Sequence, residues 1–225
     1  MLMIPTITYV FFTMFVAASL AEIIIAFNEL EKIRKIIKPF CLLFLGLAAV
    51  TLVPNHPFIY IGAFLGMIGD ICLIWKKRPI FMLGVIAFLL GHLFYISEVL
   101  FIMLKNKQMP WYFYVVVGFA MLLFIIAAYP LSKKITKHRY MALLGNLYLS
   151  ILILVTVVSI IASANGFINY MILGVIGGVS FLASDLVLTS ATFVKDFKRR
   201  DYYIMLFYLL GQAFIIAGIS LTYVL

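Results

Sequence analysis

Residues 177–186 read GGVSFLASDL and place one carboxylate, Asp185, inside an apolar run long enough to cross a bilayer. A second run, residues 62–70, reads GAFLGMIGD and ends in Asp70. An acidic side chain at membrane depth is unfavourable unless it is paired, protonated or exposed to water. Each aspartate is therefore a candidate functional residue, and the two together predict a site.

The composition of the chain excludes an ordinary soluble domain. Of its 225 residues, 66% are hydrophobic and 11% are charged, and the mean hydropathy is +1.21. Soluble domains are about half apolar and about a quarter charged. The sequence predicts a polytopic membrane protein, all-α, with one integral-membrane domain over residues 1–225. The net charge of +9 does not by itself indicate nucleic-acid binding, because in a membrane protein the placement of Lys and Arg is decided by topology.

Eight transmembrane helices are expected from apolar runs of about 20 residues, the length that crosses the hydrocarbon core. They lie near residues 7–27, 39–54, 58–75, 79–104, 109–129, 140–162, 167–193 and 202–225.

The basic residues gather in alternate connectors between these spans. Residues 28–38, 76–78, 130–139 and 194–201 together hold 15 of the 17 Lys and Arg residues. Alternate connectors lie on one side of the membrane, and an excess of Lys and Arg marks the cytoplasmic side. Both termini are therefore predicted to lie outside.

The two aspartate-bearing spans also suggest an internal repeat. Gly62 and Asp70 have the same spacing as Gly177 and Asp185, and in the spans that follow FLLGHLF at 88–94 resembles YLLGQAF at 208–214. This pattern predicts a parallel duplication of four-span halves with the aspartates facing each other across its axis. Chance similarity between Leu- and Gly-rich helices is the alternative.

The depth of each polar residue follows from the 1.5 Å rise per residue of an α-helix. Counted from the basic connectors, Asp70 lies about 9 Å deep and Asp185 about 15 Å deep. Five other polar residues reach a similar or slightly deeper layer: Glu22, His92, Tyr95, Tyr208 and Gln212. We expect these side chains to meet in one cavity that opens to the cytoplasm. Glu98, near the outer end of its span, is expected to face water.

Several chemistries can be weighed against this set. The three histidines are spread over both sides and the interior, so a zinc site is not expected, although a metal held by Asp70, Asp185 and Glu22 stays open. Ser184 lacks a histidine at its depth and is not expected to be a nucleophile. Two carboxylates suit acid and base roles. They fit the hydrolysis of an ether, an intramembrane aspartyl protease with a variant motif, or a proton- or cation-coupled transporter.

The residues that open and line these spans resemble the YhhN, or lysoplasmalogenase, family of eight-span membrane proteins. The resemblance covers nearly the whole chain and is carried by the order of Lys38–Pro39, Gly69–Asp70, Gly84, Phe88, His92, Tyr95, Ser184–Asp185, Tyr208 and Gln212. It implies hydrolysis of the vinyl ether bond of lysoplasmalogens to a fatty aldehyde and glycerophosphoethanolamine or glycerophosphocholine.

The resemblance also implies roles for the site. Asp70 and Asp185 would be the catalytic pair, with the acid and the base not distinguished. His92, Tyr95, Tyr208 and Gln212 would position water and the ether oxygen, and Lys38 would hold the phosphate. Ser184 and Glu22 are predicted to complete the substrate site, Ser184 as a hydrogen-bond partner of Asp185.

The expected partners are a lysophospholipid and the surrounding bilayer. No cofactor, metal, nucleic acid or obligate protein partner is expected. A bacterial chain would lie in the plasma (inner) membrane, with its site toward the cytoplasm.

Overall fold

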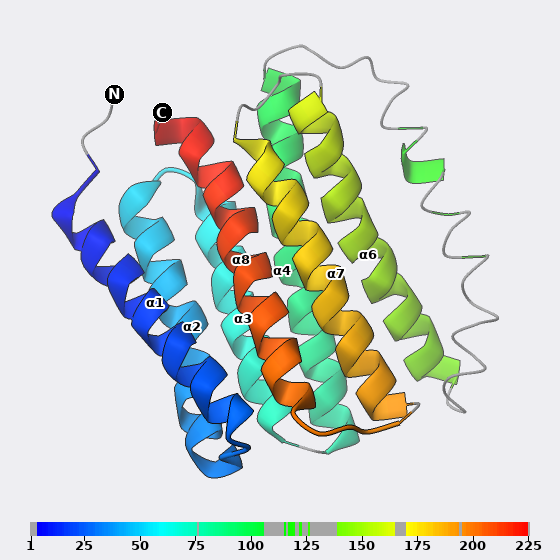
Figure 1. Cartoon of the computed structure of the whole chain (residues 1–225). Helices are drawn as coiled ribbons and strands as arrows, with labels where there is room; N and C mark the ends of the chain where they lie inside the picture. Colours follow the sequence, from blue (N-terminus) through cyan, green and yellow to red (C-terminus); the bar gives the residue numbers. More distant parts are fainter. Residues whose placement is uncertain are drawn as a thin grey trace.

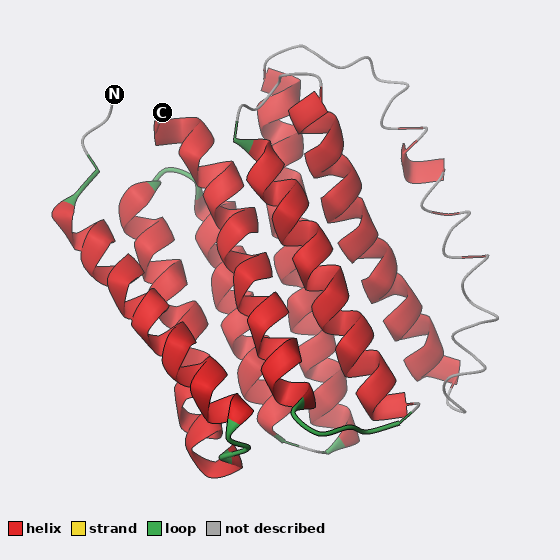
Figure 2. Ribbon diagram, in the orientation of Figure 1, coloured by secondary structure: helices red, strands yellow, loops and turns green. Residues whose placement is uncertain are grey.

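A computed structural model describes residues 4–75, 77–105, 115, 117–119, 122, 126, 139–164, 170–193 and 195–224. All regular structure within this part of the chain is helical (Figure 2). The predicted span 109–129 lies outside the described residues apart from the isolated positions just given.

Seven helices in the described part of the chain are long and apolar enough to cross a membrane. They are α1 (Thr6–Phe27), α2 (Glu31–Leu52), α3 (Pro57–Ile74), α4 (Arg78–Lys105), α6 (Arg139–Ala164), α7 (Met171–Phe193) and α8 (Arg200–Val224), drawn in Figure 1. The chain is thus a polytopic helical membrane protein, and most helix bounds agree with the predicted spans within a few residues.

The start of α2 differs from the prediction in a way that matters for the site. The expected span began at Pro39, but α2 begins at Glu31 and contains Pro39 in its interior. The basic residues assigned to a long connector therefore belong to the first turns of a helix, and the connector shrinks to residues 28–30. Lys38 is carried about two turns into the bundle, where it is buried.

The helices form a closed ring. Each packs on its neighbour in the order α1, α2, α3, α4, α6, α7, α8, and α8 also packs on α1. Helix α8 also contacts α2, α3 and α4. In its most apolar stretch of 18 residues, 61% of the residues are buried, against 22–39% in the corresponding stretches of the other six helices. It is therefore the inner helix of the bundle, and its polar side chains face several neighbours.

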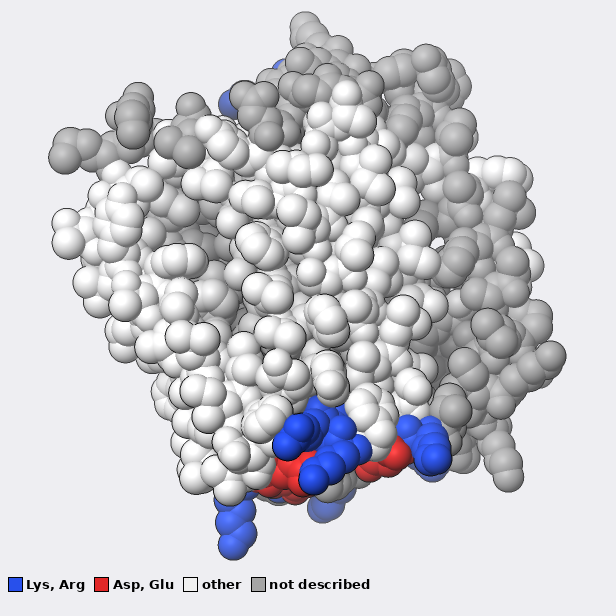
Figure 3. All heavy atoms as spheres, in the orientation of Figure 1, with Lys and Arg blue, Asp and Glu red and all other residues white. Residues whose placement is uncertain are grey.

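Most charged side chains in the view of Figure 3 gather at one end of the molecule, where blue and red atoms lie below a white, apolar wall, and a few blue atoms are visible at the other end. The connectors 28–30 and 195–199 lie at this end, and both termini lie at the opposite end (Figure 1). Large apolar side chains such as Phe12, Ile24, Phe101 and Leu186 are exposed on the outside of the helices. This arrangement suits a lipid-facing surface and agrees with the predicted alternation of connectors.

The suggested repeat has a counterpart in the helix packing. A Cβ atom on Gly91 of α4 would lie 2.9 Å from the carbonyl oxygen of Gly62 on α3, and a Cβ atom on Gly211 of α8 would lie 3.1 Å from that of Gly177 on α7. The four matched glycines thus form equivalent close crossings in the α3–α4 and α7–α8 pairs. This equivalence supports a duplication of those pairs, while the duplication of whole four-span halves stays a prediction.

Candidate functional site

Asp70 lies where three helices meet. Its carboxylate, on α3, is 1% exposed; Lys38 Nζ of α2 lies 3.1 Å from Oδ1, and the Tyr208 hydroxyl of α8 donates a hydrogen bond of 2.7 Å to Oδ2. A buried carboxylate is tolerated when it has such partners. Tyr208 and Asp70 were predicted to share a layer, and their contact confirms this.

Lys38 does not occupy the interfacial position that the sequence suggested. Because α2 starts two turns earlier than expected, the Lys38 side chain enters the bundle and is 7% exposed. Its ammonium group is directed at Asp70 rather than at a lipid phosphate outside the helices. The residue is therefore part of the aspartate site.

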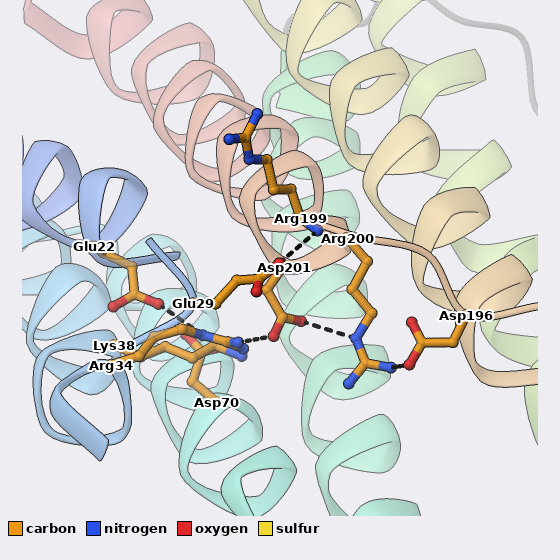
Figure 4. A network of polar contacts seen from close by, with 9 residues as sticks. All are labelled: Glu22, Glu29, Arg34, Lys38, Asp70, Asp196, Arg199, Arg200 and Asp201. Atoms are coloured by element: carbon orange, nitrogen blue, oxygen red, sulfur yellow. Dashed lines mark hydrogen bonds and ion pairs between the residues drawn. The ribbon is translucent and has the colours of Figure 1, made fainter. Parts of the chain in front are cut away.

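Glu22 of α1 lies on the same side of the bundle and is fully buried. Arg34 Nε of α2 lies 3.2 Å from Glu22 Oε1, and Arg34 also pairs with Asp201 at the start of α8. Figure 4 shows this chain of charges running from Asp201 through Arg34 to Glu22, with Lys38 and Asp70 beside it. Arg34 and Asp201 were not predicted, although Arg34 precedes Lys38 by one helical turn and so shares its face.

Gln212 and Tyr95 form a second buried contact near the aspartate. The Tyr95 hydroxyl of α4 donates a hydrogen bond of 2.9 Å to Gln212 Oε1 of α8. Gly66 of α3 lies beside them: a Cβ atom there would be in ordinary contact with Gln212 Nε2 at 3.6 Å but would meet a Leu42 side-chain carbon of α2 at 2.7 Å. The site thus has the polar layer that was expected, but Gln212 bonds to Tyr95 within it.

His92 is buried in the same region with one ring nitrogen unpartnered. Its Nδ1 lies 2.7 Å from the carbonyl oxygen of Phe88, whereas Nε2 is buried with no hydrogen-bond partner. A carbonyl oxygen only accepts hydrogen bonds, so Nδ1 carries the proton and Nε2 of the neutral ring is an acceptor. This nitrogen can therefore receive a hydrogen bond from a hydroxyl group or from water.

Ser184 and Asp185 of α7 face different neighbours. The Ser184 hydroxyl donates a hydrogen bond of 3.0 Å to the carbonyl oxygen of Ile204 on α8. The predicted pairing of Ser184 with Asp185 is thus replaced by a contact that ties two helices together. Asp185 is hydrogen-bonded to the Tyr148 hydroxyl of α6, and its Oδ2 is buried without a partner.

The two aspartates do not touch each other. Within the described part of the chain, no hydrogen bond or ion pair joins them, but a series of ring contacts does connect their partners. Tyr208, which binds Asp70, lies 5.4 Å from Phe181, Phe181 lies 4.5 Å from His92, and His92 lies 6.2 Å from Tyr148, which binds Asp185, between ring centroids. The aspartates thus stand at two ends of one aromatic layer.

Tyr148 and Phe181 are the members of this layer that the sequence did not reveal. Tyr148 occurs in a Leu-rich helix with no charged neighbour, and Phe181 looks like any core phenylalanine. Among the described residues, no group of three or more His, Cys, Asp or Glu side chains is placed to hold a metal ion. The open suggestion of a metal bound by both aspartates and Glu22 gains no support from this part of the structure.

The environment of Glu98, at the opposite end of the bundle, differs from the expected one. Glu98 was expected to face water, but it is 3% exposed. His56 Nδ1 lies 2.8 Å from Glu98 Oε1, and the Tyr223 hydroxyl donates a hydrogen bond of 2.6 Å to the same oxygen. This cluster joins the connector after α2 to α4 and α8, at the end of the bundle away from the charged connectors.

The chain was compared with known protein families. The family model described as the YhhN family matches residues 33–219, a range that contains both aspartates and their partners Lys38, Tyr148 and Tyr208. Comparisons with curated proteins and with solved structures gave no match.

Proposed function

Because the chain belongs to the YhhN family, we propose that it hydrolyses the vinyl ether bond of lysoplasmalogen-type lysophospholipids. The products are a fatty aldehyde and glycerophosphoethanolamine or glycerophosphocholine. The observation that supports this proposal best is the pair of membrane-embedded aspartates, Asp70 and Asp185, whose hydroxyl partners are joined by one aromatic layer. Two carboxyl groups in different environments can divide the acid and base roles in the cleavage of an ether.

The surroundings of the aspartates suggest different roles. Asp70 faces an ammonium group and a hydroxyl donor, a setting that suits a carboxylate anion. Asp185 faces one hydroxyl group and no cation among the described residues. We assign the proton-donating role to Asp185 and the anionic role to Asp70.

The reaction then proceeds in balanced steps. Asp185 transfers its proton to the outer carbon of the double bond, the one that is not bonded to the ether oxygen. The double-bond electrons form the new C–H bond. The adjacent carbon becomes an oxocarbenium ion, whose positive charge the Asp70 carboxylate stabilises. Water adds to that carbon, and the proton it loses passes through His92 Nε2 to Asp185, which restores the acid. The hemiacetal then collapses: its hydroxyl loses a proton as the C=O bond of the aldehyde forms, the C–O bond to glycerol breaks, and the departing oxygen takes up a proton to become the glycerol hydroxyl.

His92 is proposed to accept a hydrogen bond, and then a proton, from the attacking water. Its unpartnered Nε2 lies in the aromatic layer that connects the two aspartates. An acceptor in that position can orient a water molecule and receive its proton. Gln212 and Tyr95, already bonded to each other, would hold the ether oxygen from the side of α8.

The direction of substrate entry follows from charge. The polar head group belongs at the basic end of the bundle, and the alkenyl chain belongs between apolar helices. If that end faces the cytoplasm, as the distribution of Lys and Arg predicts, the enzyme draws its substrate from the inner leaflet. In a bacterium this leaflet is that of the plasma membrane.

The test is aldehyde release from a lysoplasmalogen by the purified protein in detergent. We expect activity in the wild type and a loss of at least about a hundredfold in Asp70→Asn and Asp185→Asn, since each removes an acid–base group. Glu98→Gln is a matched control, because Glu98 is a buried carboxyl with two partners outside the site. We expect it to retain activity.

Two outcomes would contradict the proposal. Full activity in either folded asparagine variant would exclude the two-aspartate mechanism. Absence of aldehyde from the wild type, together with ligand-dependent flux in liposomes that both asparagine variants lose, would instead identify a transporter.

A further inference from the structure

A cavity of about 340 Å³ opens at the charged end of the bundle, between the connector after α1 and the connector before α8. Its lining contains three arginines and four carboxylates, together with Ala26 and Phe197. The cavity lies outside the aspartate site, and none of the roles assigned above uses it. Its near balance of positive and negative groups suits a ligand that carries both charges.

Two of the three arginines are already paired. Arg34 binds Glu22 and Asp201, and Arg200 binds Asp196 with an N–O distance of 2.7 Å. The guanidinium group of Arg199 instead lies over the ring of Phe27, 3.9 Å from its centroid, and pairs with no carboxylate among the described residues. Arg199 is thus the cation that a ligand can reach.

Glu29 supplies an available negative charge beside it. One carboxylate oxygen accepts a hydrogen bond of 3.2 Å from the backbone N–H of Arg199, and no Lys or Arg side chain in the described residues pairs with it. Both residues have left-handed backbone conformations, with φ of 58° at Glu29 and 60° at Arg199. Non-glycine residues rarely adopt this conformation, because their Cβ atom crowds the backbone. The two connectors are therefore held together at the rim of the cavity in an unusual shape.

The cavity is aligned with the aspartate site. Asp201 lines the cavity and Tyr208, seven residues further along α8, binds Asp70, so the two levels are roughly 10 Å apart along the helix axis. Arg34 stands between them, since it contacts Asp201 at the cavity and Glu22 inside the bundle (Figure 4). A phosphodiester head group in the cavity would leave the adjoining glycerol and ether bond directed toward Asp70.

We propose that this cavity binds the zwitterionic phosphodiester head group of a single-chain lipid, with the phosphate at Arg199 and the ammonium group at Glu29. This inference rests on the proposed function, for which it names the head-group site. A phosphate monoester fits less well, because four carboxylates line the cavity against three guanidinium groups. Arg34 must release Asp201 or Glu22 as the lipid passes, which makes it the side chain that separates the two sites.

The experiment measures binding of glycerophosphoethanolamine, and separately of glycerol 3-phosphate, to the full-length protein in detergent. We expect the zwitterion to bind more tightly than the monoester. Arg199→Gln and Glu29→Gln should each weaken binding of the zwitterion by up to about fivefold, the upper end of the range for exposed charge pairs. Glutamine at position 29 keeps an oxygen for the Arg199 N–H, so the connectors retain their contact. Arg78→Gln, at the start of α4 and outside the cavity, is the matched control and should bind normally.

The outcomes separate this inference from the proposed function. If the protein binds the head group but releases no aldehyde, the proposed function fails and the cavity assignment stands. If it releases aldehyde while both glutamine variants keep wild-type binding and wild-type KM, the cavity assignment fails. Tighter binding of glycerol 3-phosphate would also overturn it. Equal competition by diacyl phosphatidylethanolamine in mixed micelles would assign the cavity to a bulk lipid and overturn the single-chain proposal.

Discussion

Replacing Lys38 with methionine removes the ammonium group that faces Asp70 while keeping a long apolar side chain. At the observed N–O distance of 3.1 Å and an effective dielectric constant of about 20, the attraction between the two charges is about 5 kcal/mol. Removing one partner of a buried pair typically costs about 3–5 kcal/mol, because the other charge is left uncompensated. We expect Lys38→Met to lower the free energy of unfolding by that amount.

A double-mutant cycle isolates this interaction. Asp70→Asn in the Lys38→Met background leaves no buried charge at the pair, so the double variant should be more stable than Lys38→Met alone. Unfolding would be followed by circular dichroism during titration of detergent micelles with sodium dodecyl sulfate. Lys77→Met, which alters an exposed lysine before α4, is the matched control and should change stability by less than about 0.5 kcal/mol.

The cycle can refute the reasoning. If the costs of Lys38→Met and Asp70→Asn add within about 0.5 kcal/mol, the two side chains do not interact in the folded protein. The ion pair would then not explain how Asp70 is tolerated inside the bundle. The anionic role assigned to Asp70 would lose its main support.

Three further substitutions test the site and its frame. Tyr208→Phe removes the hydroxyl that donates to Asp70, and we expect kcat to fall about tenfold with little change in KM. Ser184→Ala should keep its kcat and lose roughly 0.6 kcal/mol of stability, because its hydroxyl bonds to a carbonyl of α8; inactivation would instead indicate a nucleophile. Gly91→Ala should destabilise the bundle by about 1–3 kcal/mol, since its Cβ would meet a backbone carbonyl of α3 at 2.9 Å. Its control is Gly145→Ala in α6, where no described atom lies within 4 Å; comparable loss in thermal-unfolding assays would contradict the packing argument.

Depth within the membrane was predictable because it depends only on counting residues along a helix. The rise of 1.5 Å per residue placed Tyr208 and Asp70 at the same level, and the two are bonded. The same counting could not tell which way a side chain points around its helix. Gln212 shares the layer but bonds to Tyr95, and Ser184 faces the backbone of α8 rather than Asp185.

The error at α2 has a related cause. A hydropathy pattern marks where a helix enters lipid, and the basic residues before Pro39 ended the apolar run there. Proline is tolerated in the membrane helix, so α2 extends to Glu31 and takes Arg34 and Lys38 with it. Only contacts from α1 and α3 show that these two cations are partners of buried carboxylates.

The sequence by itself determined the membrane class, most helix bounds, the charged end of the molecule and the two aspartates as residues that need an explanation. These follow from the thickness of the bilayer and from the cost of charge within it, which act on the chain one position at a time. The tertiary structure alone decided that α8 is the inner helix, that Tyr148 and Phe181 connect the aspartates, and that two connectors enclose a cavity. These features depend on the order of helices around the ring and on the rotation of each about its axis, and side-chain packing fixes both.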